Sequence, residues 1–309
     1  MFNSLFEIYG KIPPQSLNRS KWLDYFYSLL RYLIRKAQSI NLRFMAGKKL
    51  KYLGGHQNEE IIVSLTSFPQ RLNTLWMTIV SLKNQTIMPR KIILYLINEE
   101  VSEETLPDSL VKEIDDIFEI RFQDGKLRAH GKYHFAMKEY PNSCVITVDD
   151  DMIYPHDTIE ALWNAHSLYP DSVITNNTHQ ILCDNNVAKP YIEWRDLYKS
   201  NEIVNIPNLI PMGVGGALYP PHLLYKDTLN VELVKNLSYL NDDLWLYAMT
   251  RLADKRVIKS RFNCFRIMPI DIDDNVTLTS INNGENQNDV QFNNIRNYYI
   301  NKCGKDIAK

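Results

Sequence analysis

Apolar residues in the first half of the chain alternate between short continuous runs and helix-like repeats. The runs predict strands at 61–66, 91–96, 119–122 and 144–148, and the repeats predict helices at 73–83, 103–117 and 132–139. This alternation predicts an α/β fold with a mostly parallel central sheet and helices on both faces. Ligands bind such sheets beyond the carboxyl ends of the strands, so the residues after each strand are the first candidates for a functional site.

A second pattern, nearer the N-terminus, is one apolar stripe at helical spacing. It predicts an amphipathic helix of roughly 20 residues. The stripe consists of Trp22, Tyr25, Phe26, Leu29, Leu30, Leu33, Ile34, Ala37 and Ile40. Such a face can dock on the rest of the protein or on a second copy, or it can lie in the headgroup layer of an anionic membrane. The sequence leaves both uses open.

Charge divides the chain near the same place. The whole chain has a net charge of -1, but residues 1–51 hold ten Lys or Arg against two acids, a net of +8 that leaves -9 for residues 52–309. Basic side chains beside an anionic bilayer each add roughly 1 kcal/mol of attraction, which makes residues 19–51 a candidate membrane surface. We therefore divide the chain into a basic amphipathic helical segment (1–55), a main α/β domain (56–275) and a polar C-terminal tail (276–309).

Composition and missing motifs exclude several classes of protein. With 45% hydrophobic and 23% charged residues, the chain has the composition of a globular protein. It has no apolar run of about 18 residues and no signal-peptide pattern, so we expect a cytoplasmic location, either free or peripheral on the inner face of the cytoplasmic membrane. The four Cys lack zinc or disulfide spacing, the Walker, HExxH and GxSxG motifs are missing, and no nucleic-acid partner is expected.

Three carboxylates follow the strand predicted at 144–148. Asp149, Asp150 and Asp151 are consecutive, and carboxylates this close repel one another unless a cation neutralises them. Oxygen-only ligands suit hard divalent ions such as Mg²⁺ and Mn²⁺, which keep positions open for phosphate oxygens. The triplet therefore indicates a metal site that grips a diphosphate, with an exposed acidic turn as the alternative.

With two further stretches, this triplet makes the chain resemble the nucleotide-sugar-dependent glycosyltransferases of the GT-A fold, most closely the family 2 type. The first stretch is the strand and loop at 61–71, followed by Ser-Leu-Lys-Asn-Gln-Thr at 81–86. The second is Val-Asp-Asp-Asp at 148–151, which matches the DxD metal motif. The third is Asn-Asp-Asp-Leu-Trp-Leu at 241–246, similar to an acidic pair that opens an acceptor-side helix.

The resemblance implies a GT-A catalytic domain over 56–275 and Mn²⁺ or Mg²⁺ held by Asp149 and Asp151. It places a nucleotide-sugar donor against Thr66, Ser67, Arg71, Lys132, Asp149, Asp150, Gly215 and Gly216. Two features depart from the family pattern. Leu-Ile-Asn-Glu-Glu at 96–100 stands where an Asp usually ends the second strand, and no His follows His222 to complete the metal shell. Asp271, Asp273 or Asp274, or the nucleotide and water, would complete it instead.

Cations and glycines add two candidate contacts for the donor. Lys132 opens a predicted helix, where backbone N–H groups also favour anions, and Lys126 and Arg128 precede it. An exposed basic turn is the alternative interpretation. Three glycines within 213–216 would let the backbone approach the donor sugar or adopt positive φ, while a purely structural turn would also use them.

An attacking hydroxyl group needs a base near its proton. Asp242 or Asp243 is the candidate, with Asp242 preferred, because the pair stands at a predicted helix start within the acceptor-side stretch. Helix capping would explain one acid there, but not two acids and an Asn. An inverting outcome follows only if one of the two is the base.

The interpretation is a metal-dependent glycosyltransferase, with a UDP-sugar as the expected donor. Its acceptor would be a glycan or a lipid-linked sugar in cell-surface polysaccharide synthesis. The basic N-terminal segment would hold the enzyme near a membrane-borne acceptor. One alternative is a sugar-phosphate nucleotidyltransferase, which ordinarily has a Gly-rich basic loop after the first strand. The loop at 66–71 has no Gly. Another alternative is a non-catalytic glycan-binding or membrane-scaffold protein.

Overall fold

The computed structural model describes residues 2–14, 19–47, 57–184, 187–197, 200–271 and 286–309. Its helices are α1 (Phe2–Lys11), α2 (Lys21–Met45), α3 (Leu72–Leu82), α4 (Asp108–Val111), α5 (Gly131–Glu139), α6 (Thr158–Leu168), α7 (Val231–Leu237), α8 (Asp242–Leu252) and α10 (Gln287–Cys303). Short 3₁₀ turns are η1 (Pro69–Arg71), η2 (Glu103–Thr105), η3 (Arg128–His130), η4 (Tyr191–Glu193) and η5 (Cys264–Arg266).

The strands form one large sheet and two small pairs. The large sheet contains β1 (Gln57–Thr66), β2 (Met88–Ile97), β3 (Phe118–Gln123), β4 (Cys144–Thr147), β6 (Ser172–Gln180), β9 (Arg195–Asp196), β10 (Leu209–Tyr219) and β11 (Arg256–Lys259). The small pairs are β5 (Met152–Ile153) with β12 (Met268–Pro269), and β7 (Cys183–Asp184) with β8 (Val187–Ala188).

The large sheet is mixed and mostly parallel. Its order is β11-β6-β10-β4-β1-β2-β3, with β9 paired to β6. The pairs β1–β2, β1–β4, β2–β3 and β6–β11 are parallel, while β10 runs antiparallel to both of its neighbours. The predicted α/β class with a mostly parallel central sheet is confirmed.

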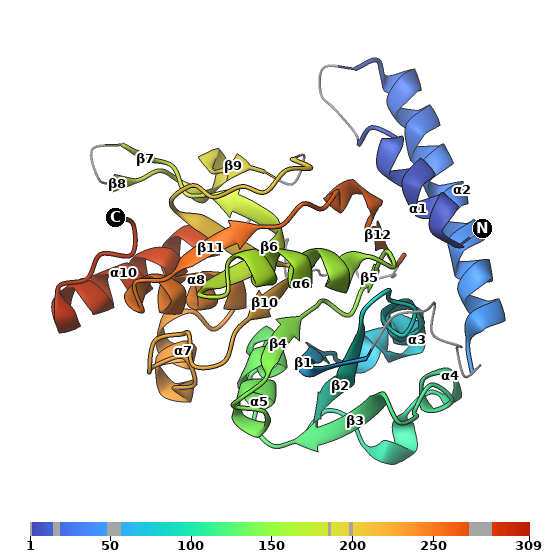
Figure 1. The fold of residues 1–309 in the computed structure, drawn as a ribbon, viewed down its shortest axis with the longest axis horizontal. Helices are drawn as coiled ribbons and strands as arrows, with labels where there is room; N and C mark the ends of the chain where they lie inside the picture. Colours follow the sequence, from blue (N-terminus) through green and yellow to red (C-terminus); the bar gives the residue numbers. More distant parts are fainter. Residues whose placement is uncertain (1, 15–18, 48–56, 185–186, 198–199, 272–285) are drawn as a thin grey trace.

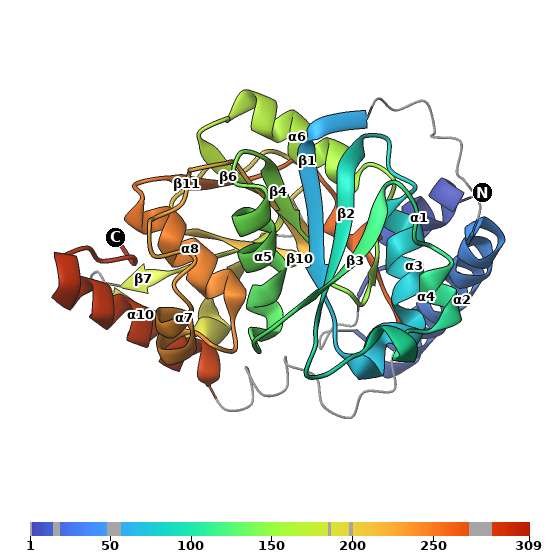
Figure 2. The same cartoon turned by 90° about the horizontal axis from the view of Figure 1, so that it is seen from below.

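Both faces of the sheet are covered, as the continuous apolar runs predict. Along β1, Ile61, Val63 and Leu65 pack with α3 and α6, whereas Ile62 points the other way and packs with α5. Because successive side chains of a strand point to opposite faces, β1 contributes to two separate apolar cores, one on each face of the sheet. Helices α8 and α10 cover the β10 and β6 end of the second face. Figure 2 shows α2 outside α3 and α4, at the opposite end of the molecule from α10.

The N-terminal helices form a hairpin against this domain. Phe6 and Tyr9 of α1 and Ile34 and Leu42 of α2 are buried in one apolar cluster with Val80 of α3. The same cluster contains Ile153 of β5 and Met268 of β12. The hairpin stands at one edge of the molecule, beside α3 and the β5–β12 pair (Figure 1).

Two predicted segments differ from the structure. The helix predicted at 103–117 is only the turn η2 and the four-residue α4, because Pro107 precedes α4 and the Asp115 carboxylate accepts the N–H groups of Ile117 and Phe118, which ends the helical path. The predicted polar tail at 276–309 contains α10, whose Phe292, Ile295 and Tyr299 are buried; residues 276–285 lie outside the described part.

Candidate active site

A cleft of about 990 Å³ lies at the carboxyl ends of β1, β2 and β4. This is where a parallel sheet of this kind binds ligands. Its lining comes from the loop after β1, the turn η3, the residues after β4, strand β10 and the start of α8. Among the predicted site residues, the lining includes Thr66, Ser67, Arg71, Lys132, Asp149, Asp150, Asp151, Asp242 and Asp243.

Asp150 is the buried member of the acidic triplet. Its carboxylate accepts a 2.5 Å hydrogen bond from Ser67 Oγ and a 2.6 Å bond from Arg71 Nη1. Burial raises the pKa of Asp150, although the Arg71 charge and the Ser67 bond oppose the shift. Asp150 thus ties the loop after β1 to the end of β4, and Thr78 of α3 binds its backbone carbonyl.

Asp151 shares the Arg71 guanidinium. Its Oδ2 lies 3.1 Å from Arg71 Nη1. Burial raises the pKa of Asp151 to about 7, and the charges of Asp149 and Asp150 contribute to the same shift. One guanidinium is therefore not enough to neutralise the acids around it.

Lys132 joins the two acidic regions of the sequence. Its Nζ lies 2.8 Å from Asp149 Oδ1 and 3.0 Å from Asp242 Oδ2. The lysine is buried at the start of α5, and its backbone carbonyl accepts a hydrogen bond from Ser64 of β1. Burial disfavours the charged amine, but the neighbouring carboxylates outweigh this and raise the pKa of Lys132 well above its usual value.

Asp242 and Asp243 stand in the first turn of α8, but neither caps it. The cap is Asn241, whose Oδ1 accepts the Leu244 N–H at 3.0 Å. Burial alone would raise the pKa of Asp242, but the Lys132 charge lowers it. Asp243 accepts the Gly213 N–H at 3.0 Å, and burial together with the Asp242 charge raises its pKa well above the usual range.

A buried histidine fixes α5 relative to the start of α8. His130 Nε2 lies 2.7 Å from the Ser238 carbonyl and Nδ1 lies 3.0 Å from the Tyr133 hydroxyl. A carbonyl only accepts, so Nε2 carries the proton and Nδ1 accepts from Tyr133. The neutral ring satisfies both bonds, and burial lowers the pKa of His130 to about 4.

The chemistry of this donor set fits a hard divalent cation. Asp149, Asp150, Asp151, Asp242 and Asp243 offer carboxylate oxygens to such an ion, and the paired cations Arg71 and Lys132 bring only two positive charges to these five acids. In this structure the acids are ion-paired: Asp150 and Asp151 with Arg71, and Asp149 and Asp242 with Lys132. Within the described residues, no group of three or more His, Cys, Asp or Glu side chains is arranged around a metal position.

The remaining predicted residues are placed as follows. Thr66 Oγ1 donates to the Tyr95 carbonyl of β2. Gly215 and Gly216 belong to β10 and are not part of the cleft lining. Gly215 packs against Asn177 of β6, and Gly216 has a φ of +84° where the β10–β6 register shifts. The glycine beside the acids is Gly213.

Several cleft residues were missed by the sequence interpretation. His179, Tyr191, Met212, Tyr239 and Asn288 line the cleft from five separate elements or loops. Asn288 belongs to α10, and its Oδ1 accepts from Asn241 at 2.8 Å. Only a helical repeat of Phe292, Ile295 and Tyr299 within an Asn-rich segment signals that α10 packs here, and no local pattern marks the others.

No protein-family model and no curated protein matches the chain. Distant similarity exists to solved structures, among them the UTP-bound UGPase from Acinetobacter baumannii, at 8% identity, covering 67% of this chain and 88% of that one with a TM-score of 0.40. The 4-diphosphocytidyl-2C-methyl-D-erythritol synthase from Anaerococcus prevotii DSM 20548 matches at 13% identity, with 75% and 97% coverage and a TM-score of 0.42.

A third similar structure is the mannosyltransferase PcManGT from Pyrobaculum calidifontis in complex with GDP-Man and Mn²⁺. It matches at 9% identity, with 84% of this chain and 68% of that one covered and a TM-score of 0.38. These similarities concern the fold alone and carry no substrate, metal or site residue to this chain. What the chain's own topology shows is an α/β fold with a mostly parallel central sheet.

Proposed function

We propose that the cleft binds a nucleotide sugar, with UDP as the expected nucleotide, and transfers the sugar to a hydroxyl of a glycan or lipid-linked acceptor in cell-surface polysaccharide synthesis. One observation carries the proposal: Lys132 joins Asp149, at the end of β4, to Asp242, at the start of α8. The acids expected on the donor side and those expected on the acceptor side therefore share one cleft.

On the donor side, Asp149 and Asp151 are the groups that would hold Mg²⁺ or Mn²⁺, which supplies charge stabilisation for a departing diphosphate. The chain adds cations of its own. Arg128 lines the cleft over the ring of Tyr239, with 5.2 Å from Cζ to the ring centroid. Among the described residues no carboxylate lies within ion-pair distance of Arg128, so its guanidinium is available to phosphate oxygens.

On the acceptor side, the electrostatics favour Asp243 over Asp242 as the general base. The Lys132 charge lowers the pKa of Asp242 and weakens it as a base, whereas burial and the Asp242 charge raise the pKa of Asp243 and strengthen it as a base. The Gly213 N–H holds the Asp243 carboxyl in place. If Asp243 takes the proton from the face opposite the leaving group, the product is inverted.

The same acid pair favours glycosyl transfer over nucleotidyl transfer. A sugar phosphate attacks through an oxygen that is already ionised, so it needs no base, whereas a sugar hydroxyl does. The loop from Thr66 to Arg71 also lacks the glycines that a nucleotidyltransferase would use around a triphosphate.

The proposal is tested by screening nucleotide sugars for Mn²⁺-dependent release of nucleoside diphosphate. We expect Asp151→Asn to abolish release with the fold intact, and Asp243→Asn to lower turnover at least about a hundredfold with donor affinity retained. Asp171→Asn, at an exposed acid far from the cleft lining, is the matched control and should be silent. Unchanged turnover in Asp151→Asn would contradict the proposal, and pyrophosphate formation from a nucleoside triphosphate and a sugar phosphate would favour a nucleotidyltransferase.

A further inference from the structure

Helix α2 is apolar on two opposite faces. One face carries Ile34 and Leu42, which are buried against α1 and α3, with Leu30 partly buried beside them. The stripe was predicted as a possible docking face, but only a few of its residues, such as Leu30 and Ile34, pack against the rest of the protein. Most of the stripe, beginning with Trp22, points the other way into solvent.

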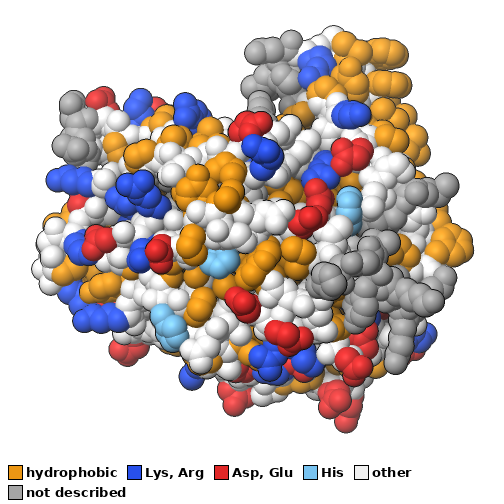
Figure 3. All heavy atoms as spheres, in the orientation of Figure 1, with side chains coloured by type: hydrophobic (Ala, Val, Ile, Leu, Met, Phe, Trp, Pro, Cys, Tyr) orange, Lys and Arg blue, Asp and Glu red, His pale blue; other side chains and the backbone are white. Residues whose placement is uncertain are grey.

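The outward face is a continuous aromatic and aliphatic surface. Its exposed members are Trp22 (72%), Tyr25 (71%), Phe26, Leu29, Leu33, Ile40 and Phe44 (68%). They recur every three, four or seven residues, so they lie along one side of the helix. The rings of Trp22 and Phe26 stack at 6.0 Å. In the space-filling view, hydrophobic side chains gather at the rim of the projection formed by α1 and α2 (Figure 3).

Charge along this helix is almost entirely positive. Lys21, Lys36 and Arg43 are exposed. The helix contains a single acid, Asp24, which is buried and paired with Arg19 at 3.2 Å on the inward side. The helix itself therefore contributes apolar groups and cations to the outward face but no carboxylate. Asp271, from the segment after β12, pairs with Lys36 at 3.8 Å.

The hairpin holds this face in place before any partner arrives. The Arg31 guanidinium donates to the Ile12 carbonyl at 3.0 Å and lies over the Tyr9 ring. The Gly47 N–H donates to Glu113 Oε1 at 2.6 Å, which ties the end of α2 to the segment after α4. Binding through this face therefore needs no folding of the helix, and its ordering cost is low.

We propose that the outward face of α2 docks the protein on an anionic lipid bilayer, with the helix lying along the surface. Aromatic and aliphatic side chains enter the headgroup region while lysine and arginine contact lipid phosphates, so one partner satisfies both chemistries. A second copy of the same face would bring like charges together. Every helix in the described part is too short or too polar to cross a bilayer. The proposal does not rest on the sugar transfer proposed above.

The test is flotation of the full chain with vesicles of phosphatidylcholine containing phosphatidylglycerol. We expect binding to these vesicles, much weaker binding to pure phosphatidylcholine, and loss of binding at about 0.5 M salt, where charges are screened. The double substitution Phe26→Ser with Leu33→Ser should lower the partition coefficient at least about tenfold. The matched control is Leu168→Ser with Ile192→Ser, which removes two exposed apolar side chains (65% and 92%) from other elements and should bind normally.

Three outcomes would overturn the proposal. The first is equal vesicle binding by the Phe26/Leu33 variant and the wild type, and the second is no binding of the wild type at low salt. The third is a concentration-dependent dimer, seen by light scattering, that the same variant abolishes while vesicles stay unbound, which would assign the face to a second copy. Nucleoside diphosphate release in solution is expected to be unchanged in this variant, so a failure of turnover and a failure of docking are separate results.

Discussion

A Cβ atom at position 213 would lie 2.9 Å from Lys132 Nζ and 3.1 Å from Asp149 Oδ1. We expect Gly213→Ala to displace the lysine amine and to lower turnover at least about tenfold, because the acids it joins lose their shared cation. The free energy of unfolding should fall less than in Gly215→Ala, since the group that must move is the flexible end of a side chain and not the backbone. Nucleoside diphosphate release and urea unfolding measure the two effects.

Gly215→Ala is the matched control for that substitution. Its Cβ would lie 2.7 Å from the Asn177 Cβ and 2.8 Å from the Asn177 backbone N, and neither atom can move without shifting β6. We expect a loss of about 1–3 kcal/mol in unfolding free energy. If Gly213→Ala destabilised the fold as much as Gly215→Ala, Gly213 would be a structural glycine and not part of the site.

At the scale of elements, His130 connects the start of α5 to the segment before α8 through its hydrogen bonds to Tyr133 and Ser238. Its folded-state pKa of about 4 is below the ordinary 6.5, so between these values the unfolded chain binds more protons and acidification favours unfolding. The stabilisation from the neutral ring is complete above pH 6.5 and is lost as the pH falls toward 4. We expect His130→Gln to be less stable at pH 7, but to lose about 2 kcal/mol less than wild type between pH 7 and 4.5.

Urea unfolding at the two pH values measures this difference, because other titrating groups contribute equally to wild type and variant. His222→Gln serves as the control, since His222 is exposed and makes one hydrogen bond, to Asn142. This variant should follow the wild-type pH dependence. A His130→Gln curve parallel to wild type would show that the pKa of His130 is the same in the folded and unfolded protein, which would contradict the prediction.

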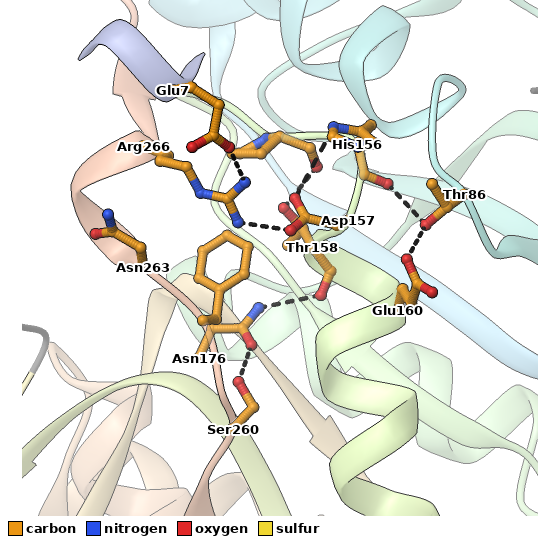
Figure 4. A network of polar contacts seen from close by, with 12 residues as sticks. Glu7, Thr86, His156, Asp157, Thr158, Glu160, Asn176, Ser260, Asn263 and Arg266 are labelled. Carbon is orange, nitrogen blue, oxygen red and sulfur yellow. Dashed lines mark hydrogen bonds and ion pairs between the residues drawn. The ribbon is translucent and has the colours of Figure 1, made fainter. Parts of the chain in front are cut away.

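At the scale of the whole molecule, the N-terminal hairpin and the acidic site are joined through one short segment. Arg266 lies between Glu7 of α1, at 2.7 Å, and Asp157 before α6, at 2.6 Å (Figure 4). Beyond it, β12 pairs with β5, and the Ile270 N–H donates to the Asp151 carbonyl at 2.8 Å. Asp271, the next residue, pairs with Arg35 of α2 at 2.7 Å. A series of ion pairs and hydrogen bonds therefore links the helix that carries the proposed membrane face to Asp151.

We expect Arg266→Met to loosen this connection. The two carboxylates lose a buried partner, at a cost of about 1–3 kcal/mol that their partial exposure limits. Hydrogen exchange followed by mass spectrometry should show faster exchange in α1 and α2 and unchanged exchange in β1 and β4. Arg261→Met, which removes an exposed ion pair with Glu202, should leave both regions unchanged. Equal protection of the hairpin in the Arg266 variant would mean that its apolar packing and its remaining polar contacts are enough to hold it.

Local patterns were sufficient for a large part of this fold. The strands β1, β2, β3 and β4 and the helices α3 and α5 follow from runs and repeats that depend only on neighbouring residues. The acidic triplet was expected at a strand end and the Asp242–Asp243 pair at a helix start, and the structure has them there. These features need only the periodicity of a strand or a helix, so no knowledge of distant contacts was required.

Other features depended on packing between segments far apart in the chain. The sequence could suggest a role for Lys132, but only the stacking of α5 and α8 on the sheet puts its amine between Asp149 and Asp242. The same holds for Gly213 as the glycine beside the acids and for α10 as part of the cleft wall. The apolar stripe of α2 predicted a helix, yet which side of it is buried was decided by α1 and α3. Periodicity is local, whereas the meeting of distant side chains is set by how whole elements pack.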